Sequence, residues 1–255
     1  MRLLARTTVN TLCALTLLGL AACGTGTSSS KDSGTSPSKT PAPFADMSGP
    51  EVVNKAIETT KKAKSMRLAI DTKSDEGPVS AHLTAALPGD CSGTMSIGPA
   101  GTIEIRKIGG TVYTKFDEAM LREQSKGEPA ADVDAAVNML AGRWMKSKAS
   151  DPDSKDMLEL CDLATMFKEF EANDDVAEKA GETTVDGKRA LRLVEKDGED
   201  TYTMLVAAEG EPYILQVDVR SSEEPTKMTL SDFDEPVEVK APAPKDIVDL
   251  NNPTR

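Results

Sequence analysis

Hydrophobic and polar residues alternate at every second position in two long stretches of the chain, residues 66–71 and 79–87. This alternation is typical of a β-strand with one buried face, because successive side chains of a strand point to opposite sides. Shorter alternating runs follow at residues 95–97, 103–105 and 112–116, separated by Gly-Asp, Gly-Pro and Gly-Gly turns. Connections this short leave no room for crossover helices, so the pattern predicts an antiparallel meander.

A period of 3.6 residues replaces the alternation before and after this meander. Ser48 and Glu51 have the spacing of a capping box, and residues 50–64 carry apolar side chains on one side only. We therefore expect an amphipathic helix that packs on the sheet. The middle of the chain predicts a short strand at 142–146 with the only tryptophan, and helices at residues 117–126, 130–140 and 154–172.

The last third of the chain returns to alternating runs. Asp186-Gly187 is a strong signal for a two-residue β-hairpin turn. Strands are expected at residues 183–185, 189–194, 202–206, 213–219 and 228–230. In total, about ten or eleven strands and the helices predict an α+β fold, a large antiparallel sheet with helices laid on one face.

The side chains on one face of the predicted strands are apolar, and this face would lie against the helices. These side chains either fill a solid core or line a cavity for a hydrophobic ligand, and the composition leaves both readings open. The 11 methionines of the chain suit an adaptable pocket as well as a plain core. The candidate ligand-binding residues are Leu68, Ile70, Leu83, Met95, Ile103, Ile105, Val112, Phe116, Leu191, Leu193, Met204, Leu215 and Val217.

Residues 1–22 have the layout of a signal peptide, because Arg2 and Arg6 precede an apolar run that ends in small residues. The run is shorter than the ~20 apolar residues that a membrane-spanning helix needs. Leu20-Ala21-Ala22-Cys23 resembles the lipobox of bacterial lipoproteins, which implies a diacylglycerol on the thiol of Cys23. The alternative is that Cys23 is merely the first residue of a secreted protein.

The segment after Cys23 is rich in Ser, Thr, Gly, Pro and Lys, which is the composition of a disordered linker. We therefore divide the chain into a signal peptide (1–22), a lipidated cysteine with its tether (23–47), a folded domain (48–240) and a C-terminal tail (241–255). A flexible tether of this length has a reach of roughly 25 Å.

The formal net charge is −12 for the whole chain and becomes −14 once the two arginines of residues 1–22 are removed. An acidic protein of this kind is a poor ligand for nucleic acid or for anionic lipid headgroups. We therefore expect no nucleic-acid partner, and membrane attachment through the acyl anchor alone. Aromatic residues make up only 4% of the chain, so any core consists mostly of aliphatic side chains and methionine.

Two cysteines remain in the folded domain, Cys91 and Cys161. In an oxidising compartment such a pair is expected to form a disulfide, which would close a loop of about 70 residues. Cys161 lies on the apolar stripe of its predicted helix, so the bond would hold a helix against the sheet. The alternative is a pair of buried free thiols.

The sequence gives little support to an enzyme. His82 is the single histidine and lies on the outward phase of its strand, so no zinc site of ordinary spacing can be assembled. The S-x-x-K pattern occurs only in the tether, where a rigid active site is not expected. The acidic runs 171–175 and 232–235 lack the spacing of a calcium loop. We expect no catalytic residues, no metal site and no cofactor.

The chain resembles the LolA-like half-barrel, and in particular the actinobacterial cell-envelope lipoproteins of the LppX and LprG type. The resemblance rests on the lipobox and on the strings SMRLAIDTK, GGTVYTKF, GRWMKSK, TTVDGKRALRLV and YTMLVAAEGEPYILQVD. It implies a curved sheet whose concave side, covered by helices, holds the acyl chains of a lipid or glycolipid. The cysteine pair is a departure from this family and would brace the helical cover.

Two hypotheses about function follow. In the first, the protein is anchored through Cys23 to the extracytoplasmic face of the cell membrane and binds or carries a lipid or glycolipid without catalysis. In the second, the core is filled and the lipoprotein binds another envelope protein.

Overall fold

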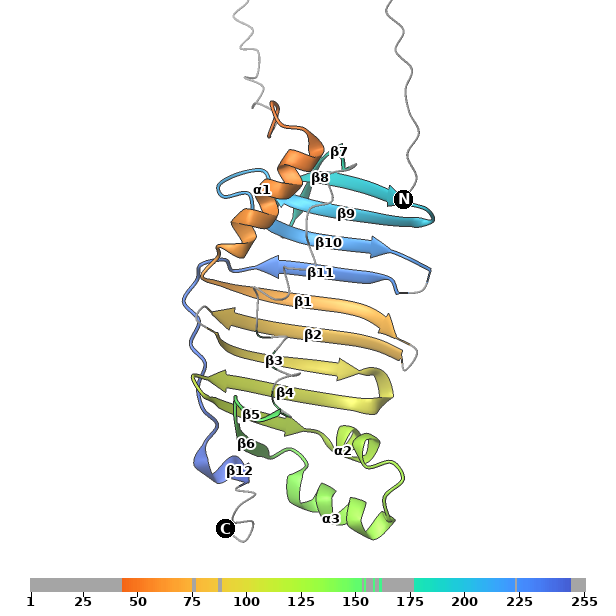
Figure 1. Ribbon diagram of the computed structural model, residues 1–255, viewed down its shortest axis with the longest axis vertical. Helices are drawn as coiled ribbons and strands as arrows, with labels where there is room; N and C mark the ends of the chain where they lie inside the picture. Colours follow the sequence, from red (N-terminus) through yellow and green to blue (C-terminus); the bar gives the residue numbers. More distant parts are fainter. Residues whose placement is uncertain are drawn as a thin grey trace, which may run out of the picture. The chain divides into compact units, whose positions relative to one another are not determined.

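Twelve strands form one open sheet in the computed structural model of the chain (Figure 1). The structure describes residues 43–74, 77–86, 89–152, 154, 158, 161, 177–222 and 224–248. The expected signal peptide, Cys23, residues 24–42 of the expected tether and most of the expected helix 154–172 lie outside the described residues.

The strand order is β12-β6-β5-β4-β3-β2-β1-β11-β10-β9-β8-β7, and every neighbouring pair is antiparallel except β12 with β6. Two meanders, β1 to β6 and β7 to β11, therefore meet where β1 pairs with β11. The strands are β1 Ser65–Ser74, β2 Gly77–Ala86, β3 Asp90–Ile97, β4 Gly101–Ile108, β5 Thr111–Phe116, β6 Trp144–Lys148, β7 Glu178–Val185, β8 Lys188–Asp197, β9 Asp200–Ala207, β10 Ile214–Arg220, β11 Thr226–Ser231 and β12 Ile247–Val248.

The α+β prediction is confirmed, and each predicted strand has a counterpart in the sheet. The strand β12 was not predicted. It lies beyond residue 240, in the segment that the sequence suggested was a tail, and it extends the sheet at the edge of β6. A two-residue parallel strand carries no alternation of its own, so only its tertiary pairing defines it.

Helix α1, Gly49–Lys61, lies across one face of the sheet near β7, β9 and β10 (Figure 1). The predicted capping box is present: the backbone N–H of Ser48 donates to Oε2 of Glu51 at 2.6 Å, and that of Glu51 donates to Oγ of Ser48 at 3.4 Å. The backbone N–H of Ser48 and its hydroxyl both donate to this carboxylate, which favours its charged form and lowers the pKa of Glu51. The buried side chains Val52, Ala56 and Ile57 join the main core, so the predicted amphipathic face packs on the sheet.

Helices α2, Glu118–Gln124, and α3, Ala130–Leu140, form a hairpin beside β4 to β6 (Figure 1). Asp117 caps α2 as expected, because its side chain accepts a hydrogen bond from the backbone N–H of Met120 at 2.8 Å. Two short 3₁₀ helices, Gly98–Ala100 and Pro244–Asp246, complete the described elements.

The hairpin between β7 and β8 turns through Asp186 and Gly187, which both have positive φ, 47° and 80°. A type I′ turn requires this geometry at both central residues, which explains the Asp-Gly sequence. In the sheet order, β6 lies next to the edge strand β12 and β7 is the opposite edge strand, so the chain between them joins opposite ends of the sheet.

Gly93 in the middle of β3 lets β2 and β3 pack closely. A Cβ atom at Gly93 would lie 2.3 Å from Cδ2 of Leu83 and 2.7 Å from the backbone oxygen of His82. Leu83 is buried, with 5% of its surface exposed, so it has little space into which to move. The glycine is therefore required by packing rather than by its backbone angles.

We predict that Gly93→Ala lowers the free energy of unfolding by about 1–3 kcal/mol, as overpacking of a core does. Gly110→Ala is the matched control, because a Cβ atom there meets nothing within 4 Å. Urea unfolding of both variants measures the difference. Equal stability of the two variants would show that Leu83 can move aside without cost.

Candidate functional site

Strand register builds one continuous apolar row across nine strands of the sheet. In antiparallel pairs, directly opposed residues point to the same face, so each pairing extends the row by one side chain. In sheet order from β8 to β5 the row consists of Leu193, Met204, Val217, Met228, Ile70, Ala81, Met95, Ile103 and Phe116.

The row changes in character along its length. Leu193 near α1 is 1% exposed and belongs to the main core cluster, together with side chains of α1. A parallel row of Leu230, Leu68 and Leu83 is also buried there. By contrast, the last three members of the row, in β3 to β5, are half-buried: Met95, Ile103 and Phe116. Among the described residues, they belong neither to the main core cluster nor to a second, smaller cluster on the opposite face of the sheet. The row therefore runs from a closed core to a partly open apolar floor.

The registers place all thirteen candidate ligand-binding residues on this apolar face except Leu215. Leu215 packs with Ala190, Leu205 and Ala207 in a second, separate cluster on the other face. The reason is a β-bulge in β10 between Ile214 and Gln216, which adds one residue and inverts the phase. Strict alternation through the strand predicted the wrong face for this one residue.

Ile214 takes the place on the apolar face that the pattern assigned to Leu215. Its side chain is 1% exposed in the main core cluster. Its backbone N–H donates to Oγ1 of the buried Thr60 in α1 at 3.0 Å. A buried N–H without a partner would be costly, so this bond both satisfies the bulge and fixes α1 on the apolar face.

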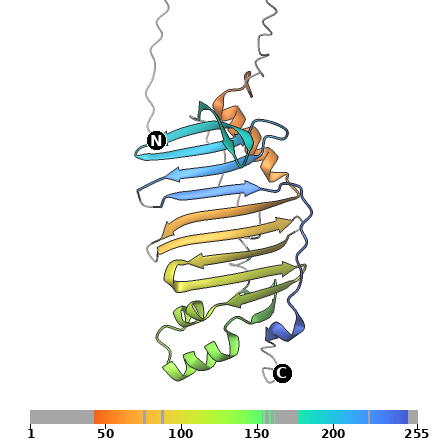
Figure 2. The same ribbon diagram turned by 180° about the vertical axis from the view of Figure 1, so that it is seen from behind.

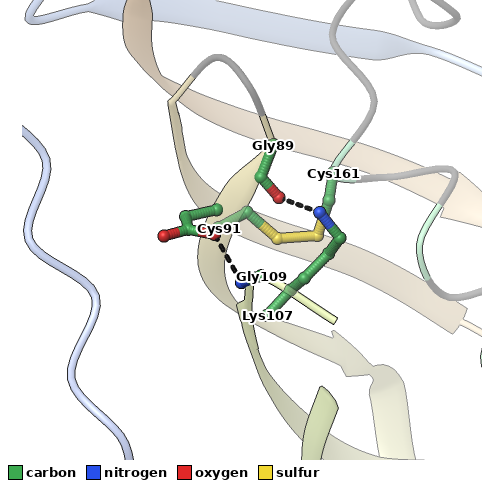
Figure 3. The surroundings of a disulfide bond; sticks show 6 residues. Gly89, Cys91, Lys107, Gly109 and Cys161 are labelled. Atoms are coloured by element: carbon green, nitrogen blue, oxygen red, sulfur yellow. Dashed lines mark hydrogen bonds between the residues drawn. A yellow bond between two sulfur atoms is a disulfide. The ribbon is translucent and has the colours of Figure 1, made fainter. Parts of the chain in front are cut away.

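The predicted disulfide between Cys91 and Cys161 is present, with a Cα–Cα distance of 5.7 Å (Figure 3). Both cysteines are buried in the main core cluster, and Leu158 packs against it. Residues of the β6–β7 connection thus lie on the apolar face. The disulfide attaches this connection to β3, beside the half-buried end of the row.

A lysine lies opposite Cys91 on the same face of the sheet. Lys107 in β4 pairs in register with Cys91, and its Nζ donates to the backbone oxygen of Gly89 (Figure 3). Lys107 forms no ion pair with a carboxylate in the described part of the chain. This cation beside the apolar floor was missed by the sequence reasoning, because only the register places it next to the disulfide.

A hydrogen-bond chain fixes the point at which the polypeptide leaves β11. The rings of Tyr213 and Phe233 stack with centroids 4.1 Å apart, and the hydroxyl of Tyr213 donates to Oδ2 of Asp234 at 2.6 Å. The backbone N–H of Lys64 donates to Oδ1 of the same carboxylate at 2.6 Å. The bond to the carboxylate raises the pKa of Tyr213 to about 12 and lowers the pKa of Asp234.

The remaining sequence predictions concern the single histidine, the possible metal ligands and the hydropathy that a helix needs to span a membrane. His82 is exposed on the face opposite the apolar row, as its phase predicted. Among the described residues, no group of three or more His, Cys, Asp or Glu side chains is placed to hold a metal ion. None of the described helices has both the length and the hydropathy to cross a bilayer.

Comparisons with known proteins give structural neighbours only. No protein-family model and no curated protein matches the chain. The structure is similar to that of LprF from Mycobacterium bovis, with a TM-score of 0.49, 15% identity and coverage of 79% of this chain and 99% of LprF. It is also similar to the lipoprotein LppX from Mycobacterium tuberculosis, with a TM-score of 0.46, 13% identity and coverage of 75% and 97%.

A third neighbour is MucB from Pseudomonas aeruginosa in its complex with MucA, with a TM-score of 0.32, 11% identity and coverage of 77% of this chain and 59% of that one. LppX is one of the lipoproteins of the type that the sequence resembles. At these identities the likeness extends to the fold alone.

We predict that the double variant Cys91→Ala, Cys161→Ala loses about 4 kcal/mol of unfolding free energy, the chain-entropy value for a closed loop of 70 residues. Urea unfolding with and without reductant measures the loss. Reduction should destabilise the unmodified protein by a similar amount and leave the double variant unchanged. Free thiols at both Cys91 and Cys161 in the unreduced protein, or equal unfolding midpoints, would contradict the bridge.

Proposed function

We propose that the protein is a lipoprotein of the cell envelope, anchored to the membrane through Cys23, whose apolar sheet face binds a hydrophobic ligand such as a lipid or glycolipid. The protein carries this ligand without catalysing a reaction on it. Residues 1–22 act as a signal peptide, residues 23–47 as a lipidated tether, and the sheet domain as the ligand-binding part on the extracytoplasmic side.

The apolar row is the observation that carries this proposal. An open sheet with one apolar face must cover that face, because each Å² of exposed apolar surface costs about 25 cal/mol. In the described part of the chain, α1 covers the β7 to β10 end, and Cys161 and Leu158 lie on the face further along. Met95, Ile103 and Phe116 remain half-buried outside the clusters. Acyl chains are suited to such a floor, because each methylene that they bury contributes ~0.8 kcal/mol.

The chain enters the domain at the closed end of this row. Phe44 and Met47 pack against the main core, and Nζ of Lys179 in β7 donates to the backbone oxygen of Phe44 at 2.5 Å. A tether of roughly 25 Å that leads to this point keeps the domain near the bilayer. Confinement of this kind raises the effective concentration of membrane lipid, so a modest intrinsic affinity is sufficient for loading.

Lipid extraction tests the proposal directly. The full chain with Cys23→Ala is purified from its native host, extracted with organic solvent and analysed by mass spectrometry. We expect stoichiometric non-covalent lipid. Ile103→Glu in this background places a charge in the apolar row and should reduce the lipid content about tenfold, because a carboxylate is poorly tolerated beside acyl chains.

Ile108→Glu is the matched control. It makes the same change in the same strand, but Ile108 pairs with Thr111 on the opposite face, so the lipid content should not change. Thermal unfolding establishes that both variants are folded. A lipid-free extract from the Cys23→Ala chain would contradict the proposal and favour the alternative, a lipoprotein with a filled core that binds another envelope protein. Equal loss of lipid in both glutamate variants would contradict the assignment to the apolar face.

A further inference from the structure

The face opposite the apolar row contains a groove of about 420 Å³ that runs across several strands. Its lining extends from Thr229 and Ser231 in β11 to Trp144 in β6, and it includes Arg67 in β1 and Arg106 in β4. In Figure 2, no described helix crosses the strands β11, β1, β2 and β3. The volume lies within the range of small-molecule sites.

Hydroxyl groups form the floor of this groove. Two neighbouring cross-strand rows contribute them, one through Ser231, Thr84 and Ser92 and the other through Thr229 and Thr94. All five residues are half-buried, and none of these side-chain hydroxyls forms a hydrogen bond with a described residue. The described structure also holds no fully buried side-chain polar atom without a partner, so these hydroxyls face open space. Each can donate one hydrogen bond and accept others.

Arg106 supplies a pre-positioned cation at one end. Its Cζ lies 4.4 Å from the centroid of the Trp144 ring, and its Nη1 donates to the backbone oxygen of Lys240 at 3.1 Å. These two contacts hold the planar guanidinium in place but use only one of its five N–H donors. Arg106 forms no ion pair with a carboxylate among the described residues. Its remaining donors therefore stay available for a carboxylate from outside.

The other charged side chains that line the groove itself already have partners. Glu104 pairs with Lys115 at 2.5 Å, and Arg67 pairs with Asp232 at 3.0 Å. The uncompensated charge is thus positive, in a protein whose formal net charge is −12. This local excess of positive charge favours the binding of an anionic group at Arg106.

The segment 235–240 forms one wall of this region. It passes along the ends of β1 to β5 on its way to β12 (Figures 1 and 2), and Oγ of Ser65 donates to the backbone oxygen of Glu235. Two further hollows, of about 210 and 410 Å³, lie along this segment, and each shares Ser92 with the groove. The three hollows therefore share the lining residue Ser92, which pairs in register with Arg106, and together they leave room for a ligand longer than one ring. The two outer hollows are also lined by carboxylates, those of Glu235 and Glu238.

We propose that this groove binds an acidic saccharide, with a sugar carboxylate on Arg106 and the sugar hydroxyls on the five Ser and Thr side chains. The guanidinium fork matches a carboxylate, and a floor of unbonded hydroxyls matches a ligand that carries many donors and acceptors. The inference is independent of lipid binding, because the two sites lie on opposite faces of the sheet.

Fluorescence titration tests this proposal, because Trp144 is the only tryptophan of the chain and borders the groove. The full chain in detergent is titrated with digalacturonic acid, with neutral galactobiose and with inorganic phosphate, and calorimetry repeats each titration. We expect saturable binding of the acidic disaccharide only. Arg106→Gln and Thr94→Val should each weaken it about tenfold, the effect of losing one strong hydrogen bond.

Arg220→Gln is the matched control, because it removes the same charge from an exposed position at the end of β10 and should leave the affinity unchanged. Absence of binding by both methods would overturn the proposal. Equal affinity for phosphate, or an unchanged affinity in Thr94→Val, would reduce the groove to a simple anion site and overturn the saccharide assignment. Equal weakening in Arg220→Gln would show that only the net charge matters, which also contradicts it.

Discussion

The apolar row from Leu193 to Phe116 is the constraint on which the other features of the sheet depend. Each of its contacts comes from one register pairing, and a slip of one residue in any strand would turn an apolar side chain to the opposite face. The row therefore fixes the register of nine strands together. The same registers place the hydroxyls of the groove on the other face, so the two candidate sites are consequences of a single arrangement.

Two further contacts keep this apolar face covered. Thr60 satisfies the backbone of the β10 bulge and so ties α1 to the closed end, while the disulfide of Cys91 ties the β6–β7 connection to β3. The first contact is a hydrogen bond to a buried backbone N–H, and its loss would leave that N–H without a partner, which lowers stability. The second contact is covalent. Beside the disulfide lies the half-buried end of the row, where an acyl chain would find apolar side chains without displacing a packed core.

The sequence predicted much of this architecture because a large part of it is local. Alternation located the strands, the Asp186-Gly187 dipeptide located a hairpin, and the Ser48–Glu51 spacing located the start of α1. The disulfide followed from the count of cysteines in the folded part. The first three signals lie within a few residues of one another in the sequence. The folded domain has only two cysteines, so their pairing had no alternative partner, and none of these predictions needed knowledge of the tertiary structure.

The features that escaped prediction depend on contacts between distant residues. Leu215 changes face because of a bulge, and β12 exists only because it pairs with β6. The stacking of Arg106 on Trp144 joins residues that are far apart in the sequence and meet through two strand pairings. The prediction for Cys23 concerns a residue outside the described structure, so it stays a prediction.

Photoaffinity labelling measures most directly whether the apolar row holds an acyl chain. A fatty acid with a diazirine in its chain is bound to the full protein and irradiated, and the labelled residues are found by peptide mass spectrometry. We predict labels on Met95, Ile103 and Phe116 of the half-buried end. Labels confined to Leu205 and Leu215 on the opposite face, or no saturable labelling, would contradict it.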